Sequence, residues 1–512
     1  MSVDKMTHQR QMKTRSSYGR GVCFRPSWAL AALSVIVVIV IVVTAVVWAK
    51  DLIRLTLHTN MGLENNTLSY NLWVKPPILP LVSVYVFNYT NADEFEKGID
   101  TRLQVEELGP YVYRQRTEKV NVVFNHNGTV SYQEKVSLSF VPELSARHHP
   151  RQDYIAVPNI PLLSALSVLK DSYVLAQLAF LAMTAGMDMQ QFVRISVHDF
   201  FWGYDDALFS LARTYTSLTQ ELPYKKFGIL MKRNGITRNR ITMYTGKQNL
   251  QQRGVMSRLN GEERLHHWLG DECNRIDGTD GSMFPPNLVK RNSTIYIFNE
   301  DACRRFPLEY VEDITVHDGI PGLRFRAPRD LFAKPDVNPQ NACYCRFEMG
   351  FCPPSGVFDA SPCTYGAPIM MSFPHFYLGD PILLETVEGL KPDPEKHDGY
   401  LDVHEELGVP LDGKSRFQMN ILVRKSKTLQ HLANFKDGSI LPIAWFEVGI
   451  DGLPEEIMDM LYHLTFTTRH IQFAVRYMLL VLSAVLVYVL VRRIRCRPPA
   501  DDVSDTGVVT PI

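Results

Sequence analysis

The fold is decided around one stretch, Cys343-Tyr-Cys-Arg-Phe-Glu-Met-Gly-Phe-Cys352-Pro-Pro, which continues through Cys363 to Ser372-Phe-Pro-His-Phe-Tyr-Leu-Gly-Asp380. Four of the chain's eight cysteines lie in it, and Cys273 and Cys303 lie shortly before it. Such crowding indicates either a disulfide framework or a metal site, and the cellular compartment decides between the two. The compartment can be inferred from the two ends of the chain.

The N-terminal end carries an uncharged segment at residues 28–49 that is rich in Val, Ile, Leu and Ala. As a helix it would measure about 33 Å, which is enough to cross a bilayer core and too long for the apolar part of a signal peptide. Residues 1–27 contain six Lys or Arg and one acidic residue, Asp4. This excess of positive charge predicts a cytosolic N-terminal tail and an uncleaved membrane anchor.

The C-terminal end has a second apolar segment at residues 471–491, and Arg492, Arg493, Arg495 and Arg497 follow it directly. We therefore expect a second span and a cytosolic C-terminal tail at residues 492–512. The residues between the two spans, 50–470, are expected to form one extracellular or lumenal ectodomain. Its most cysteine-rich part is residues 273–363.

This topology places six cysteines outside the cytosol, where disulfides persist. Zinc is the weaker interpretation, because no paired CxxC motif or CxxC with HxxxH is present. Spacing alone leaves the pairing of the six cysteines open. The other two, Cys23 and Cys496, lie on the cytosolic side close to a span, where palmitoylation is common.

Two further kinds of modification or binding motif are present. Sequons for N-glycosylation occur between the spans and in neither tail, at Asn65, Asn88, Asn127 and Asn292. The chain ends in Thr510-Pro-Ile512. This Thr-x-hydrophobic form is bound by PDZ domains, which makes Thr510 and Ile512 a candidate PDZ ligand.

The ectodomain changes character along the chain. Residues 72–140 are rich in β-branched residues and turns and predict strands, and strands resume at 227–441. Between them, residues 158–216 are rich in Ala, Leu and Met and predict helices. One of these is Tyr173 to Gly186, in which the stretch Tyr173 to Met183 is apolar enough to resemble a span but too short to cross a membrane. The residues alone allow either an ordinary packed helix or one that presents an apolar surface.

Motifs for catalysis are not convincing. Gly408-Val-Pro-Leu-Asp-Gly-Lys-Ser415 matches a phosphate loop, but the residues before it are polar and those after it predict a strand rather than a helix. His404-Glu405 lacks the second His of a zinc protease. The remaining histidines are interpreted as surface or packed residues, with a pH-sensing role left open. We expect the protein to have no enzymatic activity and no cofactor. Its net charge of zero gives no reason to expect nucleic-acid binding.

The sequence resembles the class B scavenger receptor family almost from span to span. The resemblance rests on seven motifs in a fixed order: Glu107-Leu-Gly-Pro-Tyr-Val-Tyr-Arg114, Asp153-Tyr-Ile-Ala-Val-Pro-Asn159, Trp202-Gly-Tyr204, Cys273-Asn-Arg-Ile-Asp-Gly-Thr-Asp-Gly281, Phe284-Pro-Pro286, Asp301-Ala-Cys303-Arg304 and Pro374-His-Phe376.

The resemblance implies an α+β membrane protein whose two terminal transmembrane helices flank an antiparallel β-barrel-like core with an internal hydrophobic tunnel. It makes residues 158–216 a helical apex that meets ligands. The ligand-binding residues that we predict there are Tyr173, Leu175, Leu178, Phe180 and Met183. The resemblance also implies the disulfides Cys273–Cys343, Cys303–Cys363 and Cys345–Cys352.

The predicted function is that of a plasma-membrane scavenger receptor that binds lipid or lipoprotein-like particles and transfers apolar lipid through the tunnel. Fatty-acid-handling relatives carry apex lysines, whereas this chain has none between Lys170 and Trp202, so sterol or carotenoid is favoured over fatty acid. Alternatives are a sorting receptor of endosomal or lysosomal membranes and, less well supported, a subunit of a two-span channel. A homo-oligomer is compatible with each of these.

Overall fold

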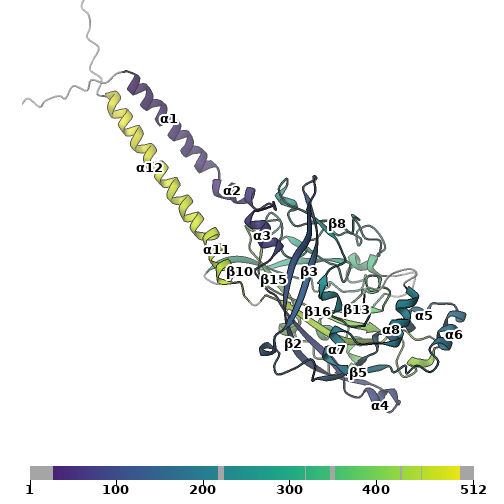
Figure 1. Cartoon of the computed structure of the whole chain (residues 1–512). Coiled ribbons are helices and arrows are strands. Elements are labelled where there is room, and N and C mark those ends of the chain that lie inside the picture. The colour runs from purple at the N-terminus through teal and green to yellow at the C-terminus, as the bar shows by residue number, and fades with distance from the viewer. Residues whose placement is uncertain are drawn as a thin grey trace, which may run out of the picture. The chain divides into compact units, whose positions relative to one another are not determined.

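A computed structural model describes residues 27–216, 224–316, 319–345, 352–426, 429–450 and 452–495. The chain divides into two compact units (Figure 1). Unit 1 combines the two ends of the chain, up to Thr56 and from Leu464, and unit 2 is Leu57–His463.

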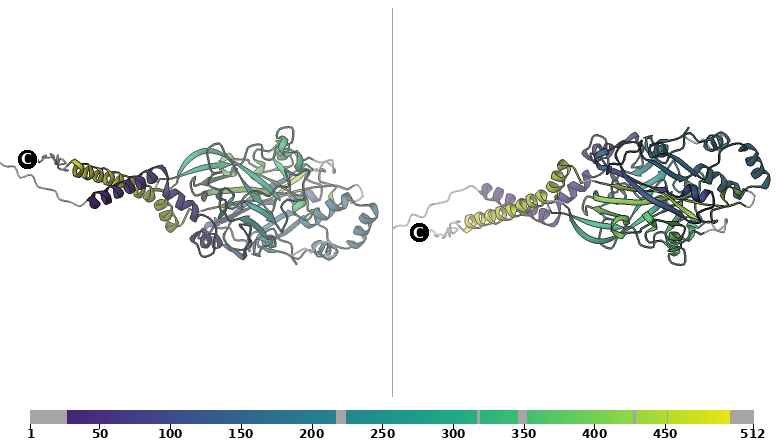
Figure 2. Two further views of the ribbon diagram at one scale, coloured as in Figure 1. Left: turned by 90° about the horizontal axis from the view of Figure 1, so that it is seen from above. Right: turned by 90° about the horizontal axis from the view of Figure 1, so that it is seen from below.

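Unit 1 is built from two long apolar helices, α1 (Ser27–Ala49) and α12 (Thr468–Arg495), which lie side by side (Figures 1 and 2). Both are long and apolar enough to cross a membrane, and they contain the spans predicted from the sequence. The helices are joined by polar contacts. The hydroxyl oxygens of Thr44 and Ser483 are 2.9 Å apart, and Arg476 Nε donates a hydrogen bond of 3.1 Å to the carbonyl of Val47. Such contacts are effective between helices in lipid because no water competes for them.

Unit 2 is mainly sheet. Its strands are β1 (Leu81–Tyr89), β2 (Leu103–Phe124), β3 (Thr129–Phe140), β4 (Tyr154–Pro158), β5 (Phe192–Ser196), β6 (Gly235–Ile236), β7 (Ile241–Tyr244), β8 (Met256–Leu259), β9 (Thr294–Asn299), β10 (Arg304–Val316), β11 (Ile320–Arg326), β12 (Val357–Asp359), β13 (Ile369–Ser372), β14 (Val387–Glu388), β15 (Tyr400–Val403), β16 (Pro410–Leu422) and β17 (Ile440–Gly449).

The remaining helices are short. They are α2 (Leu52–Asn60), α3 (Leu68–Val74), α4 (Ala92–Glu96), α5 (Ile160–Lys170), α6 (Val174–Met183), α7 (Val197–Trp202), α8 (Ala207–Thr216), α9 (Ile382–Glu385), α10 (Pro394–His397) and α11 (Glu455–Tyr462).

The main sheet runs in the order β8-β7-β3-β2-β1-β17-β16-β15-β11-β10-β9, and β13 and β12 extend from β16. Its pairs are antiparallel apart from the short parallel pair of β14 with β2. Within the described part of the chain no pairing joins β8 to β9. The α+β class with an antiparallel core is therefore confirmed, but the core is an open sheet rather than a closed barrel.

In β1, at the centre of the sheet, successive side chains point to opposite faces. Val82, Val84 and Val86 are fully buried on one face, where they join the largest hydrophobic cluster. On the other face Tyr85 stands opposite Trp445 of β17, and their rings stack at 3.8 Å. Cross-strand pairs of this kind set the register of antiparallel strands.

The glycine of the first family-like motif, Gly109 in Glu107–Arg114, has a structural cause. It lies in β2 with a φ of 139°, where β1 changes register, and a Cβ at this position would lie 2.8 Å from the carbonyl oxygen of Val84. Only glycine permits that approach at this backbone conformation.

The phosphate-loop pattern has a structural cause. Its first glycine, Gly408, has a φ of 62° and packs against Phe284, whose N–H donates a hydrogen bond of 2.7 Å to the Gly408 carbonyl. The second glycine, Gly413, lies inside strand β16. This strand begins at Pro410, earlier than the sequence predicted, so the backbone amides form ladder hydrogen bonds instead of a phosphate cradle.

Candidate functional site: an exposed apolar helix

A two-stranded sheet of β4 and β5 brackets the first part of the predicted helical insertion, residues 158–216, and α7 and α8 follow β5. Strands β4 and β5 pair antiparallel, with Val157 opposite Val193, so the two ends of the segment that contains α5 and α6 lie side by side. Asn159 follows β4 at the start of this segment. Its side chain caps α5 by accepting from the N–H of Leu162 at 3.1 Å, and it also donates to the carbonyl of Gln190 at 3.0 Å. The strand β5 was not predicted from the sequence.

Helix α5 is buried, as is α7 later in the insertion. Leu162, Leu163 and Leu166 are fully buried in the main hydrophobic cluster, and α8 packs beside α5. Helix α6 lies next to α5 at the edge of unit 2 (Figure 1). Helix α6 therefore packs on α5 and, through Phe180, on the main hydrophobic cluster.

Helix α6 has its polar residues inside and its apolar residues outside. Gln177 and Thr184 are buried, whereas the outward positions are occupied by Val, Leu, Ala and Met. Gln177 is held by hydrogen bonds from its Nε2 to the carbonyls of Leu169 (3.0 Å) and Ser172 (3.1 Å). Its Oε1 accepts from the hydroxyl of Ser426 at 3.1 Å. The amide thus joins α6 to the end of α5, where the carbonyl of Leu169 also accepts from the N–H of Ser172.

The structure separates the five predicted ligand-binding residues into two groups. Tyr173 is 91% exposed, Leu175 78%, Leu178 51% and Met183 55%. Phe180 is only 7% exposed and packs into the main cluster, so it does not belong to the outer surface. The reason is helical periodicity, because Phe180 lies one turn from Gln177 on the inward face. We call Tyr173, Val174, Leu175, Leu178 and Met183 the α6 outer face.

A cleft of about 690 Å3 opens beside the C-terminal end of α6. Its lining includes Asp93 and Glu96 of α4, Arg194 of β5, and Asp188. Arg194 forms ion pairs with Asp93 and, at 3.7 Å, with Glu96. The carboxylate of Asp188 accepts a hydrogen bond from Gln190 and has no ion pair within the described residues. Three carboxylates against one guanidinium make this cleft acidic, which no sequence motif indicated.

A second unpredicted cluster is centred on Glu107 of β2, whose side chain is about one-third exposed and contacts the buried side chains of His375 and Trp445. Its carboxylate lies 2.5 Å from His375 Nε2 and accepts a hydrogen bond from Trp445 Nε1 at 2.7 Å. Burial alone would raise the pKa of Glu107, but these two hydrogen bonds outweigh it and hold the pKa below its ordinary value. The His375 ring also stacks on that of His397 at 4.5 Å. The Pro-His-Phe motif therefore supplies a packed histidine.

The cysteine-rich region contains disulfides between Cys273 and Cys343, Cys303 and Cys363, and Cys345 and Cys352. These are the pairs that the family resemblance implied. Next to them the buried guanidinium of Arg304 lies 4.1 Å from the Tyr344 ring and 5.0 Å from that of Phe358. Cation–π contacts of this kind compensate a charge that cannot reach water.

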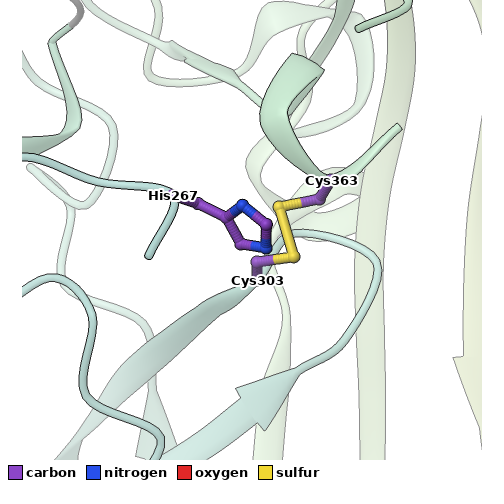
Figure 3. A group of neighbouring side chains, drawn as sticks. All are labelled: His267, Cys303 and Cys363. Carbon is purple, nitrogen blue, oxygen red and sulfur yellow. A yellow bond between two sulfur atoms is a disulfide. The ribbon is translucent and has the colours of Figure 1, made fainter. Parts of the chain in front are cut away.

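His267 lies against the Cys303–Cys363 disulfide, and the three side chains bring a ring nitrogen and two sulfurs within 4.8 Å (Figure 3). Cysteine binds zinc as a thiolate, and both sulfurs are consumed by the disulfide, which leaves one imidazole nitrogen as the remaining ligand of this group. The group therefore does not fit a metal ion while the two cysteines are joined as a disulfide.

The other predicted sites are placed as follows. Asn65, Asn127 and Asn292 are exposed, and Asn88 is half-buried in β1 with its side-chain oxygen accepting from the N–H of Ala156 at 2.9 Å. Glycosylation of all four stays a prediction. The candidate palmitoylation sites Cys23 and Cys496 and the candidate PDZ ligand Thr510 and Ile512 lie outside the described residues.

The helices, the disulfide-bonded sheet and the exposed helical insertion together define a two-span membrane protein with one large ectodomain. The chain belongs to the CD36 family, whose sequence profile matches residues 30–494. It is 34% identical over 446 residues to scavenger receptor class B member 1 of Bos taurus, covering 87% of this chain and 84% of the relative. It is 35% identical over 376 residues to lysosome membrane protein 2 of Mus musculus, covering 72% and 74%.

Proposed function

We propose that this chain is a lipid-binding scavenger receptor of the plasma membrane or the lysosomal membrane, and that it captures lipid or lipid-bearing particles on the α6 outer face. The observation that carries the proposal is the exposure of this face. Leu175 is 78% exposed on a helix whose polar side chain, Gln177, is buried. A soluble domain gains nothing from such an arrangement unless an apolar ligand covers it.

Transfer to the membrane needs no catalytic step in this proposal. Burying apolar surface is favourable by about 25 cal/mol per Å2, so a lipid leaves water readily whenever a continuous apolar path is available. The family resemblance supplies that path as an internal tunnel. Enzymatic activity is not part of the proposed function.

The charges near α6 support uncharged cargo. Lys170, the nearest lysine before α6, is paired with Asp437 at 3.0 Å, and the cleft after α6 is acidic. A fatty-acid carboxylate would find no free lysine between Lys170 and Trp202. Sterols, sterol esters and carotenoids carry no such charge, and we propose them as the transferred lipids.

The test is uptake of labelled sterol ester, carotenoid and long-chain fatty acid by cells that express the full chain. A variant with Leu175→Asp and Leu178→Asp makes the α6 outer face polar, and Val311→Asp, in β10, is a matched substitution of another exposed apolar residue. We expect selective uptake that is lost in the α6 variant and kept in the control, at equal surface expression. Absence of uptake by the wild-type chain would contradict the proposal and favour a protein-sorting receptor.

Two further partners are proposed from the sequence. A PDZ domain would bind the C-terminal Thr510-Pro-Ile512 by strand addition. A homo-oligomer would place several α6 outer faces against one particle and raise the apparent affinity through avidity.

A further inference from the structure

The three disulfides of the ectodomain differ in one respect. Among the residues that the structure describes, only the Cys303–Cys363 disulfide has an imidazole beside it, that of His267 (Figure 3). The ring nitrogen and the two sulfurs lie within 4.8 Å of one another. One histidine with two cysteines is a ligand set of zinc sites in which the fourth position stays open to water.

The spacing of the three ligand atoms suits a zinc ion once the S–S bond is open. Zinc binds a thiolate at about 2.3 Å and an imidazole nitrogen at about 2.0–2.1 Å in a tetrahedron, so its two sulfurs lie about 3.8 Å apart. A disulfide joins its sulfurs at about 2.0 Å, so the two sulfurs must separate by about 1.8 Å. With the two Cα atoms 6.0 Å apart, rotation of the cysteine side chains supplies this movement without a shift of the backbone.

The segments that carry the three ligands are held together by contacts other than the disulfide. Trp268, which follows His267, donates a hydrogen bond of 2.8 Å from its indole Nε1 to the carbonyl of Cys303. The Trp268 ring also packs on that of Phe358 in strand β12, with 5.3 Å between the ring centres. Cys363 lies shortly after this strand. Opening the disulfide leaves these contacts unbroken, so the three side chains stay close to one another.

Solvent reaches the group from the side of His267, which is exposed. Cys363 is half-buried, whereas Cys303 is only 8% exposed, so a small thiol attacks the sulfur of Cys363. The S–S bond breaks, and its electron pair leaves with the sulfur of Cys303. A second thiol then displaces the first from Cys363, so that two thiols become one disulfide as the two cysteines are reduced. Zinc binds the two cysteines as thiolates, with release of two protons.

From this geometry we infer that His267, Cys303 and Cys363 form a zinc site when the Cys303–Cys363 disulfide is reduced by a small thiol such as free cysteine. The metal then joins the two segments that the disulfide had joined, which are 60 residues apart in the sequence. Zinc and the disulfide are therefore alternative cross-links at one place in the cysteine-rich region. This site goes beyond the proposed function and does not depend on lipid capture.

The experiment uses the full chain in phosphatidylcholine nanodiscs, with Cys23→Ser and Cys496→Ser to remove the cytosolic thiols. A phosphine opens the disulfides and is removed without oxygen, and Co2+ is added as a probe because its thiolate complexes absorb in the near ultraviolet. Zn2+ is then added, and alkylation followed by mass spectrometry shows which cysteines it protects. His267→Ala removes a ligand. His266→Ala is the matched control, because it changes the adjacent histidine, whose side chain is 81% exposed.

We expect thiolate absorption with Co2+ in the reduced chain and none in the oxidised chain. Zinc should protect Cys303 and Cys363 from alkylation and raise the unfolding temperature of the reduced chain. His267→Ala should weaken Co2+ binding about ten-fold or more, and His266→Ala should leave it unchanged. Three results would overturn the site: protection spread evenly over all six ectodomain cysteines, equal Co2+ affinity in His267→Ala, or a reduced chain that zinc neither binds nor refolds. Lipid uptake by the oxidised chain is a separate measurement that none of these results changes.

Discussion

Glu300, which is half-buried, and His397, which is buried, are residues of unit 2 whose pKa values are shifted in opposite directions. Burial is the main cause in both. It raises the pKa of Glu300 to about 7, with Glu134 and Asp301 adding to the effect and Asn239 and Lys119 opposing it. It lowers the pKa of His397 to about 4, and the adjacent His375 adds to the effect. A receptor that meets both neutral and acidic compartments would pass through the pH range in which both groups titrate.

Glu300 makes the fold more stable in acid. Since the folded state binds this proton more tightly, its contribution is complete below the unfolded pKa of 4.5 and is lost as the pH rises through about 7. We expect Glu300→Gln to remove this loss of folding free energy with rising pH, which is on the order of 1–3 kcal/mol. Thermal unfolding of the full chain from pH 5 to pH 8 would measure it, with the exposed Glu143→Gln as control. If the difference in unfolding temperature between wild type and Glu300→Gln were constant over that pH range, the predicted role of Glu300 would be refuted.

His397 has the opposite effect. Its Nδ1 accepts the N–H of Asp393 at 2.9 Å, so protonation at Nδ1 would break that hydrogen bond. The folded state therefore favours the neutral ring, and stability falls as the pH drops from about 6.5 towards about 4. We expect His397→Asn, which keeps an acceptor but does not titrate, to lose less stability between pH 6.5 and pH 4.5 than the wild type. The exposed His266→Asn should retain the wild-type slope, and an equal slope in His397→Asn would show that the ring does not control it.

At the scale of elements, α6 depends on one side chain for its attachment. Gln177→Leu has nearly the same size but removes the donor to the carbonyl of Ser172, one of the donors to the carbonyl of Leu169, and the contact with Ser426. A buried polar group without a partner costs about 1–3 kcal/mol. We expect faster amide hydrogen exchange in α6 and little change in the global unfolding temperature. Ala179→Leu, on the exposed side, is the control, and protection of α6 that is unaltered in Gln177→Leu would contradict the anchoring role.

At the scale of the molecule, the disulfides connect segments that are distant in sequence. Cys273 and Cys343 are separated by 70 residues, and their Cα atoms are 6.1 Å apart. Closing a loop of this length constrains the unfolded chain by roughly 4 kcal/mol. We expect Cys273→Ser to be retained in the secretory pathway, as measured by surface labelling and glycan maturation. Cys496→Ser, on the cytosolic side, should reach the surface normally, and normal surface arrival of Cys273→Ser would argue against a structural role for this disulfide.

The sequence by itself determined the features that are local or that depend on composition. The spans follow from the length and apolarity of residues 28–49 and 471–491, and the helices of the insertion follow from residues without β-branched runs. The family resemblance implied the cysteine pairs, which the structure contains, and it predicted a ligand surface in the insertion, which stays a prediction. These signals depend on residues that are close together in the sequence, or on motifs that follow one another in a fixed order. They can therefore be detected without knowledge of three-dimensional contacts.

Only the tertiary structure decided which atoms meet. Gln177 reads as an ordinary polar residue until α5 and Ser426 surround it, and Phe180 reads as part of the apolar surface until its side of α6 faces the core. The acidic cleft combines α4, β5 and the segment after α6, and the Glu107 cluster combines residues that are hundreds of positions apart. The burial and the charge environment of these residues are set by packing between segments that are distant in the sequence. That packing cannot be inferred from a pattern of neighbouring residues.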